Sequence, residues 1–444
     1  MKLFKTKSIL LSLFLLSFAI LGFSTNEQSS NEKATEYLNY FLLGNYEKAC
    51  EFHDATLKNA FPATVMANAA ANIEFQFGKY AGNMEIIKEN TVQGNNVYLI
   101  EAEYKDLYLN YTVSVNPDGE IAGFFFKQGK IKESGIPQYL DENNVIEKDI
   151  IIGEAPFELK GTLTTPKGLK EYPVVIISQG SGAHDKDGTI GPNSIYRDIA
   201  LGLGNIGVAC VRYEKRTYAY PGPIAEIKPT EDATYIQYEY TDDIYHALDF
   251  CDTIEGNTGT ILLGHSQGGA IVPNIAKEDP RVKKLILLAA GIRRFAQISI
   301  DQNLYVASIT ELSEQQKQAL EQALVFFKMV LEHKIPAETQ IQPGLYVAYM
   351  YDFDKYEPMP VLKNLNIPIL VVQGEKDFQA TMEGDFLPMK NELGDRENFT
   401  FVSLPDLDHI FKPIEGEMAD LNSINEKGFP EKVLFDTIKE WIFE

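Results

Sequence analysis

Hydrophobic and polar positions in the N-terminal part of the chain follow first a helical and then a strand-like spacing. Tyr37, Leu38 and Phe41 fall on one face of a helix, and later segments alternate apolar with polar residues between turns such as 116–119. This pattern predicts helices followed by an antiparallel meander. We therefore expect a small α+β domain over residues 25–132, with helices at 32–53 and 62–77 and strands at 83–91, 96–104, 106–115 and 120–127.

From residue 145 to residue 444 the pattern changes to short apolar runs that alternate with longer helical stretches. Strands that are apolar on both faces and alternate with helices predict a mostly parallel sheet covered by helices on both sides. The polar segment 133–144 is expected to be the linker between the two domains. Strands are predicted at 148–153, 157–164, 173–178, 207–212, 259–263, 282–289, 367–373 and 399–404, and helices at 195–205, 233–252, 268–276, 382–393 and 432–443.

One long insertion, at about residues 293–362, interrupts the alternation. It contains a helical stretch at 313–333 and then an aromatic group, Tyr346, Tyr349, Tyr351, Phe353 and Tyr356. A long insertion at the carboxyl edge of such a sheet is typical of a lid or specificity cap, and aromatic side chains there would supply an apolar wall for a substrate. The alternative is that these helices only pack against the domain.

The first residues of the chain have the pattern of a targeting segment. Lys2, Lys5 and Lys7 precede the apolar run 9–23, and small residues near Ser24 fit a cleavage site. The pattern predicts a secretory signal peptide over residues 1–24, because the run is shorter than the ~20 residues that span a bilayer. We expect an exported protein, periplasmic or secreted, without a membrane anchor after cleavage, although an uncleaved anchor stays an alternative.

Composition narrows the class of function. The chain has 444 residues, 45% of them hydrophobic and 23% charged, with a formal net charge of −23. These values fit a two-domain globular protein, and the acidic balance argues against binding nucleic acid, whose phosphates it would repel. The three cysteines give no disulfide framework and no metal-ligand spacing, so we expect neither a metal nor a cofactor. Residues 184–188, which include two aspartates, lack the remaining ligands of a calcium loop.

A nucleophile motif follows the predicted strand at 259–263. Gly264, Ser266 and Gly268 form a G-x-S-x-G pattern between a strand and a helix, and Gly269 extends it. A serine on such a sharp turn requires neighbours without Cβ atoms, and the turn exposes its hydroxyl at the sheet edge. Ser266 is therefore the predicted nucleophile, with Gly264 and Gly268 forming the nucleophile elbow.

The base and the acid follow from chain order. In this type of site the order is Ser, then Asp or Glu, then His. His409 follows the last predicted strand, whereas His333 lies in the insertion, so we predict His409 as the base. Asp377 follows the strand at 367–373 and is the predicted acid, with Glu375 as the nearest rival. His265, next to the nucleophile, is expected to be a packed neighbour.

Backbone donors must stabilise the oxyanion that forms during acyl transfer. The N–H of Gln267, directly after the nucleophile, is one predicted donor. The glycine-rich loop after the strand at 173–178 should supply the other, from Ser181 or alternatively from Gly180.

These segments together resemble the α/β-hydrolase superfamily, in particular bacterial serine esterases and acyl-peptidase-like hydrolases. The resemblance covers residues 145–444 and is carried by 179–182, 210–216, 264–269, 374–377 and 408–409. Family members often have Asp and Gly where this chain has Glu214 and Thr217. Residues 39–52 also resemble the start of the small cystatin-like or NTF2-like domain found ahead of some of these hydrolases.

The resemblance implies that Ser266, Asp377 and His409 form a triad that hydrolyses carboxylic esters with small acyl groups, on a small molecule or linked to a glycan or peptide. Two other functions stay open. A peptidase acting on free amino termini would need acidic residues for the amine, such as Asp352, Asp354 and Glu357. The third possibility is an exported binding protein without catalysis.

Overall fold

The computed structural model describes residues 29–132, 135–224, 226–342, 345–420 and 423–444. The predicted signal peptide lies outside the described residues. The described residues form two compact units, one within 29–70, 85–100 and 111–126, and the other within 71–84, 101–110 and the described ranges from 127 onward. Within the described ranges, no helix combines the length and apolar character that crossing a membrane requires.

The N-terminal part contains helices and one four-stranded sheet. The helices are α1 (Ser30–Leu42), α2 (Tyr46–Glu51), α3 (Ala55–Ala60) and α4 (Ala63–Phe77), and the strands are β1 (Met84–Val92), β2 (Asn95–Glu103), β3 (Leu107–Val115) and β4 (Ile121–Ile131). The strands follow one another in chain order, β1-β2-β3-β4. Aromatic side chains from α1 and the sheet pack together, among them Phe41 and Phe124 with ring centroids 4.9 Å apart. The hydrophobic pattern does not predict helix α3. Its N-cap is Asp54, whose carboxylate accepts from the Leu57 N–H.

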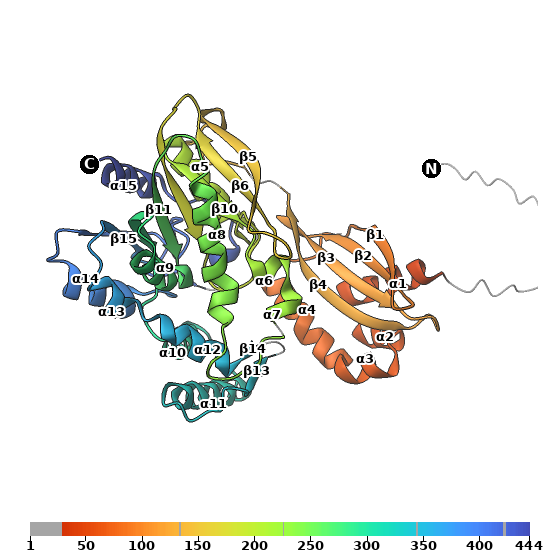
Figure 1. Cartoon of the computed structure of the whole chain (residues 1–444). Coiled ribbons are helices and arrows are strands. Elements are labelled where there is room, and N and C mark those ends of the chain that lie inside the picture. The colour runs from red at the N-terminus through yellow and green to blue at the C-terminus, as the bar shows by residue number, and fades with distance from the viewer. Residues whose placement is uncertain (1–28, 133–134, 225, 343–344, 421–422) are drawn as a thin grey trace, which may run out of the picture. The chain divides into compact units, whose positions relative to one another are not determined.

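An eight-stranded sheet organises the second unit, in the order β16-β15-β12-β11-β7-β10-β6-β5 (Figure 1). Its strands are β5 (Val145–Ile152), β6 (Leu159–Pro166), β7 (Tyr172–Ser178), β10 (Ala209–Tyr213), β11 (Asn257–His265), β12 (Val282–Leu288), β15 (Ile369–Gly374) and β16 (Phe399–Leu404). Strand β6 pairs antiparallel with β5 and β10, and the pairs from β10 through β16 are parallel. This order and these directions define the α/β-hydrolase fold, which confirms the predicted fold class.

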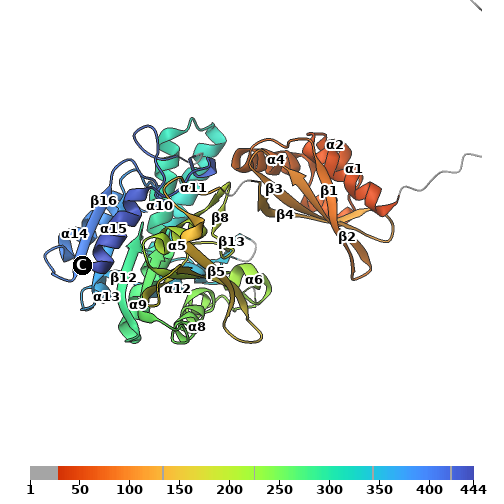
Figure 2. The same cartoon turned by 90° about the horizontal axis from the view of Figure 1, so that it is seen from above.

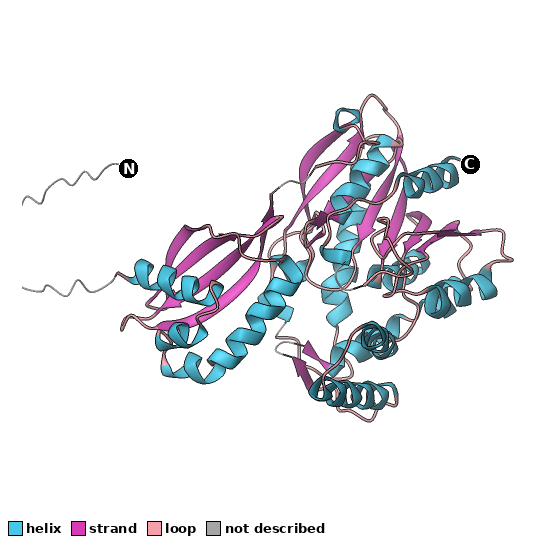
Figure 3. Ribbon diagram, turned by 180° about the vertical axis from the view of Figure 1, so that it is seen from behind, coloured by secondary structure: helices cyan, strands magenta, loops and turns pink. Residues whose placement is uncertain are grey.

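Helices bury both faces of this sheet (Figure 3). Alternate residues of β7 face opposite sides, so that Val174 and Ile176 belong to one apolar core and Val175 and Ile177 to the other. Side chains of α8 (Asp242–Cys251) and α9 (Gln267–Glu278) complete the first core, and those of α5 (Ile195–Asn205) and α15 (Lys432–Phe443) complete the second. The remaining short pieces are β8 (Thr189–Ile190), β9 (Asn193–Ser194), α6 (Arg216–Ala219), α7 (Pro221–Ile224) and the 3-10 turns η1 (Glu142–Asn144) and η5 (Ser423–Asn425).

The insertion between β12 and β15 is mainly helical (Figure 2). It contains α10 (Phe295–Ile309), α11 (Glu314–Leu331), β13 (Gln340–Gln342), β14 (Leu345–Tyr346), α12 (Val347–Phe353), η3 (Asp354–Tyr356) and α13 (Pro358–Leu362). Ser313 begins α11 with a capping box that is completed by Gln316. Every residue of α12 is buried, which places Tyr349, Tyr351 and Phe353 of the predicted aromatic group inside the unit, whereas Tyr346 and Tyr356 are half-buried.

Two predicted helices differ from the prediction in their first turns. The predicted helix 233–252 begins with the π-helical turn η2 (Gln237–Thr241) before α8, and the predicted helix 382–393 begins with the π-helical turn η4 (Met382–Phe386) before α14 (Leu387–Leu393). A π turn inserts an extra residue into the helical repeat and re-aims the side chains around it, often at functional sites. Glu239 and Asp385, both buried, lie in these two turns.

The packing of α5 against α15 can be tested at a glycine. A Cβ on Gly202 would overlap the ring of Phe435, whereas a Cβ on Gly222 would meet nothing within 4 Å. We expect Gly202→Ala to lower the free energy of unfolding by about 1–3 kcal/mol, as overpacking in a core does. Gly222→Ala is the matched control and should leave stability nearly unchanged. Denaturant unfolding of both variants checks this, and equal stabilities would contradict the packing argument.

Candidate active site

Ser266 occupies the strained turn between β11 and α9. Its backbone has φ 55° and ψ −121°, a conformation that residues other than glycine rarely adopt. The turn is held by the Ser266 N–H, which donates to the Leu288 carbonyl at 3.0 Å. A Cβ on Gly264 would lie 2.6 Å from the Gly268 carbonyl oxygen, and one on Gly268 would overlap the Ser178 carbonyl. The turn can therefore form only with glycine at both positions.

His409 and Asp377 are brought together by the loops that follow β16 and β15. His409 Nδ1 lies 2.7 Å from Asp377 Oδ2, and the Asp377 side chain is fully buried. Asp377 also accepts from the backbone N–H groups of Gln379 and Ala380, at 2.7 and 3.1 Å, and from Gln373 Nε2 at 3.0 Å. These donors satisfy a carboxylate that would otherwise be costly to bury.

The same contacts set the charge and orientation of His409. Burial by itself lowers the pKa of His409, but the Asp377 carboxylate favours the charged ring and raises the pKa above its ordinary value. Because a carboxylate only accepts, Nδ1 carries the proton and Nε2 is left free to accept one. His409 thus has the tautomer that a general base for a serine hydroxyl requires.

The competing acids have other partners. Glu375 is exposed and accepts from the Ser403 hydroxyl at 2.7 Å. Asp406 pairs with Lys376 at the surface, and Asp408 accepts from the backbone N–H groups of Ile410 and Lys412. None of these carboxylates is bonded to the His409 ring among the described residues.

Ser266 and two of the predicted oxyanion donors, Ser181 and Gln267, line one cavity of about 110 Å³, to which Phe295, Ile298 and Phe353 also contribute. His409 lines a neighbouring cavity of about 420 Å³, and Gln302 and Gln379 line both. The described part of the structure contains no hydrogen bond between Ser266 and His409. The structure therefore brings Asp377 together with His409, and Ser266 together with Gln267 and Ser181. Gln302 and Gln379 line the cavities of both groups.

The N–H groups of Gly180 and Ser181, the two candidate donors of the loop, differ in their hydrogen bonding. The Gly180 N–H donates to the Tyr196 hydroxyl at 2.6 Å and is not available to a substrate. Among the described residues the Ser181 N–H has no acceptor, and Gln267 contributes the first N–H of α9, which has no intrahelical acceptor. The geometry favours Ser181 with Gln267 over Gly180.

His265 connects the glycine-rich loop 179–182, here called the oxyanion loop, with the loop after β16 that carries His409. The sequence analysis did not predict this connecting role. His265 Nε2 lies 3.0 Å from the His409 carbonyl, so it must donate, and Nδ1 lies 3.2 Å from the Tyr196 hydroxyl. Burial lowers the pKa of His265 to about 3, which keeps the ring neutral and lets Nδ1 accept from Tyr196. A chain of hydrogen bonds thus runs from the Gly180 N–H through Tyr196 and His265 to the His409 backbone.

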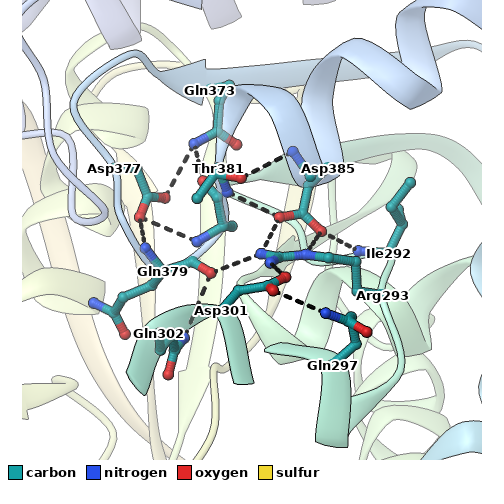
Figure 4. Close-up of polar contacts among 12 residues, drawn as sticks. Ile292, Arg293, Gln297, Asp301, Gln302, Gln373, Asp377, Gln379, Thr381 and Asp385 are labelled. Carbon is teal, nitrogen blue, oxygen red and sulfur yellow. Dashed lines mark hydrogen bonds and ion pairs between the residues drawn. The ribbon is translucent and has the colours of Figure 1, made fainter. Parts of the chain in front are cut away.

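A second polar network joins the loop after β15 that carries Asp377, here called the acid loop, to the insertion (Figure 4). Arg293, just before α10, pairs with the fully buried Asp385 at 2.5 Å and donates to the Gln379 carbonyl at 3.0 Å. Arg293 also pairs with Asp301 of α10, and Asp385 accepts from the Thr381 N–H at 2.8 Å. The loop that presents Asp377 is therefore fixed from both sides.

Other predicted features lie outside this centre. Asp185 accepts from the Asp187 and Thr189 N–H groups and forms an ordinary turn. Across the described ranges, no three His, Cys, Asp or Glu side chains are grouped so that they could hold a metal ion. His333 is exposed and stacks on Tyr351, with ring centroids 4.5 Å apart.

The fold and these contacts define the class as an α/β-hydrolase-fold protein with a serine elbow and a His–Asp pair. No protein-family model matches the chain. The chain is 28% identical over 438 residues to Esterase EstD of Thermotoga maritima. The match covers 98% of this chain and 99% of that protein.

Solved structures give weaker similarities. Est1E from Butyrivibrio proteoclasticus is 18% identical with a TM-score of 0.43, over 66% of this chain and 97% of that one. The Pyrococcus horikoshii acylaminoacyl peptidase is 11% identical with a TM-score of 0.42, over 82% of this chain and 56% of that one.

The role of Asp377 predicts a pH effect. Asp377→Asn removes the charge that raises the His409 pKa. The asparagine NH2 group can also donate to Nδ1, which stabilises the tautomer with its proton on Nε2. We expect kcat for ester hydrolysis to fall by about 10⁴-fold. Because the neutral ring is the predicted base, the acid limb of kcat/KM should also move to lower pH.

A pH–rate profile measures both effects. Glu375→Gln is the matched control, since Glu375 is exposed and bonds Ser403, and its profile should match the wild type. An Asp377→Asn variant that keeps wild-type kcat would refute the assignment.

Proposed function

We propose that this protein is an exported carboxylic ester hydrolase that cleaves esters of small acyl groups through an acyl-enzyme on Ser266. The 2.7 Å contact between His409 Nδ1 and the buried Asp377 carries the proposal, because it prepares a base with a free Nε2. The strained elbow at Ser266 and the esterase that matches nearly the whole chain support the same function.

The proposed reaction uses groups of this chain only. Ser266 Oγ attacks the acyl carbon while His409 Nε2 takes its proton, and the carbonyl oxygen becomes an oxyanion facing the Ser181 and Gln267 N–H groups. His409 then gives the proton to the departing alkoxide, and an acyl-enzyme remains. Water, activated by His409, attacks this ester and releases the acid. General-base assistance of this kind contributes about 10²- to 10⁴-fold and one oxyanion donor about 10²- to 10³-fold.

The cavity beside Ser266 supports a small acyl group. Its volume is about 110 Å³, whereas sites for drug-sized ligands begin at roughly 300 Å³. Phe295 and Phe353 from the insertion and Ile298 of α10 supply apolar walls. An acyl chain of a few carbons fits this space, and a long chain would require the insertion to move.

The larger cavity beside His409 supports an alcohol group on the other side. His409 delivers its proton to the leaving oxygen, so the alcohol must lie on the side of this ring. The cavity there has a volume of about 420 Å³ and is lined by both polar and apolar side chains, including Asn303 and Phe378. The proposed substrate therefore has a small acyl part and a larger alcohol part.

Two of the three acids considered for peptide recognition, Asp352 and Asp354, are already used by the fold. Asp352 accepts from the Ile236 N–H at 2.7 Å and pairs with Lys355. Asp354 pairs with Arg294 at 2.7 Å and accepts from the Phe295 N–H. Neither carboxylate lines the cavity at Ser266. This arrangement favours an ester over a peptide with a free amino terminus.

Export is part of the proposal because the first 24 residues have the pattern of a signal peptide, with Lys2, Lys5 and Lys7 ahead of an apolar run. We expect the mature protein to begin near residue 25 and to be recovered outside the inner membrane. N-terminal sequencing of protein from the periplasm and the medium of an expressing bacterium checks this. A full-length chain that stays with the membrane fraction would instead support an uncleaved anchor.

The ester function predicts a chain-length profile. With p-nitrophenyl esters from acetate to decanoate, we expect kcat/KM to be highest for the short chains and to fall steeply beyond butyrate. Ser266→Ala should lose turnover by at least about 10⁴-fold, because the nucleophile is gone.

The control is thermal unfolding, which should be the same for Ser266→Ala as for the wild type. Full ester hydrolysis by Ser266→Ala would contradict the mechanism. No hydrolysis of any ester by wild-type protein whose Ser266 still reacts with a fluorophosphonate would favour a peptidase, and failure of that labelling would favour a non-catalytic binding protein.

A further inference from the structure

Lys215, two residues after β10, is a buried cation that contacts the oxyanion loop. Its side chain is 3% exposed, and Nζ lies 2.8 Å from the Gly180 carbonyl and 3.0 Å from the Gly182 carbonyl. These two carbonyls flank Ser181 on either side. The backbone of Lys215 also bonds to this loop, because its N–H donates to the His184 carbonyl at 3.0 Å.

The Gly180 carbonyl and the Ser181 N–H belong to one peptide unit. The described cis peptide bond is Ala155-Pro156, and the unit between Gly180 and Ser181 is trans, so its C=O and N–H point in opposite directions. Fixing the carbonyl on Lys215 therefore fixes the direction of the Ser181 N–H. A charged donor on the carbonyl also polarises the peptide and makes its N–H a stronger donor.

The second oxyanion donor is connected to the same cation. The Tyr240 hydroxyl lies 2.6 Å from Lys215 Nζ and 2.9 Å from the Gly180 carbonyl, and 3.1 Å from Gln267 Oε1. Gln267 Nε2 donates to the Tyr349 hydroxyl at 2.9 Å. The side chain of Gln267, whose backbone N–H is the other proposed donor, is thus held between η2 and the insertion.

The charge of Lys215 is balanced by a carboxylate from the π turn η2. Glu239 lies 2.7 Å from Lys215 Nζ, and its other oxygen accepts from the Tyr349 hydroxyl at 2.7 Å. Burial lowers the pKa of Lys215, and the ion pair with Glu239 opposes that shift. Lys215 has three N–H groups and meets four acceptors, all of them protein groups, so it is fully engaged.

We propose that Lys215 is a positioning residue for catalysis, which aims the Ser181 N–H at the oxyanion and, through Tyr240 and Glu239, holds Gln267 and the insertion in register with it. This inference rests on the proposed function. It differs from a purely structural role, because Lys215 acts on a peptide unit whose opposite end faces the reacting atoms.

Neighbouring cations provide the contrast. Arg212, on β10, is as buried as Lys215 but pairs with Glu147 and Asp187. Arg216 pairs with Asp243 through its guanidinium. Among the described contacts, neither arginine bonds to residues 179–182.

The test compares Lys215→Met with the wild type. We expect kcat for p-nitrophenyl acetate to fall by about 10²-fold with little change in KM, because an oxyanion donor acts in the transition state. The affinity for an alkyl trifluoromethyl ketone, whose adduct with Ser266 places an oxyanion at the same donors, should fall in parallel. A structural role alone would lower the melting temperature without this matched loss.

Two further variants keep the test decisive. The double variant Lys215→Met/Glu239→Gln also removes the carboxylate that Lys215→Met leaves unpaired. If Lys215→Met alone does not fold, the double variant should fold and still show the loss in kcat. Arg212→Met, which removes an equally buried cation of the same segment, should lower the melting temperature but keep kcat. Wild-type kcat and ketone affinity in a folded Lys215 variant would overturn the inference, as would an equal loss of kcat in Arg212→Met.

Failure of the proposed function gives a different result. If the wild type hydrolyses no ester, the second-order rate of fluorophosphonate labelling at Ser266 replaces kcat, since the phosphonyl oxygen uses the same donors. A 10-fold or greater slowing in Lys215→Met relative to Arg212→Met, about 1.4 kcal/mol, would support the positioning role without the ester function. Equal labelling rates, or no labelling of the wild type, would overturn it.

Discussion

The fully buried carboxylate of Asp377 is the constraint on which the candidate active centre depends. A charge without water needs several donors, and here two backbone N–H groups, Gln373 and His409 supply them. Satisfying that charge forces the loop after β15 to fold around the carboxylate, and it orients the His409 ring. The geometry of the proposed base and the cost of burial are therefore met by the same hydrogen bonds, so the pair of His409 and Asp377 is held in place without a substrate.

Two further buried carboxylates repeat this principle around the centre. Asp385 lies in one π turn and holds Arg293, and Glu239 lies in the other and holds Lys215. Each cation in turn binds backbone carbonyls of a loop, that of Gln379 in the acid loop and those of Gly180 and Gly182 in the oxyanion loop. The π turns point these acids inward, where a regular α-helix would place other residues of the turn.

The hydrophobic pattern predicts much of this molecule, because strands buried on both faces and helices between them leave a strong local signal. The bounds of α5, α15 and β16 agree with the predicted ranges, and the contact of His409 with Asp377 joins two residues chosen from chain order and from their places after predicted strands. The π turns could not be predicted, because their extra residue depends on tertiary contacts of Glu239 and Asp385. The roles of Tyr196 and Lys215 were also missed, although Lys215 lies in a segment that carries the family resemblance. Their partners in the oxyanion loop are the Gly180 N–H and the Gly180 and Gly182 carbonyls, which lie 16 to 35 residues away and are backbone groups that leave no pattern in side-chain identity.

The insertion contacts both halves of the active centre, and this has a consequence for substrate choice. Arg293 and Gln302, at its start, bond to the Gln379 carbonyl near Asp377, and Tyr349, near its end, bonds to Gln267 next to Ser266. The walls of the small cavity, Phe295, Ile298 and Phe353, belong to the same insertion. A larger acyl group would have to move walls that are tied to the acid loop and to an oxyanion donor. Selectivity for small acyl groups would then arise from loss of catalytic alignment as well as from lack of space, so poor substrates should show a lower kcat and not only a higher KM.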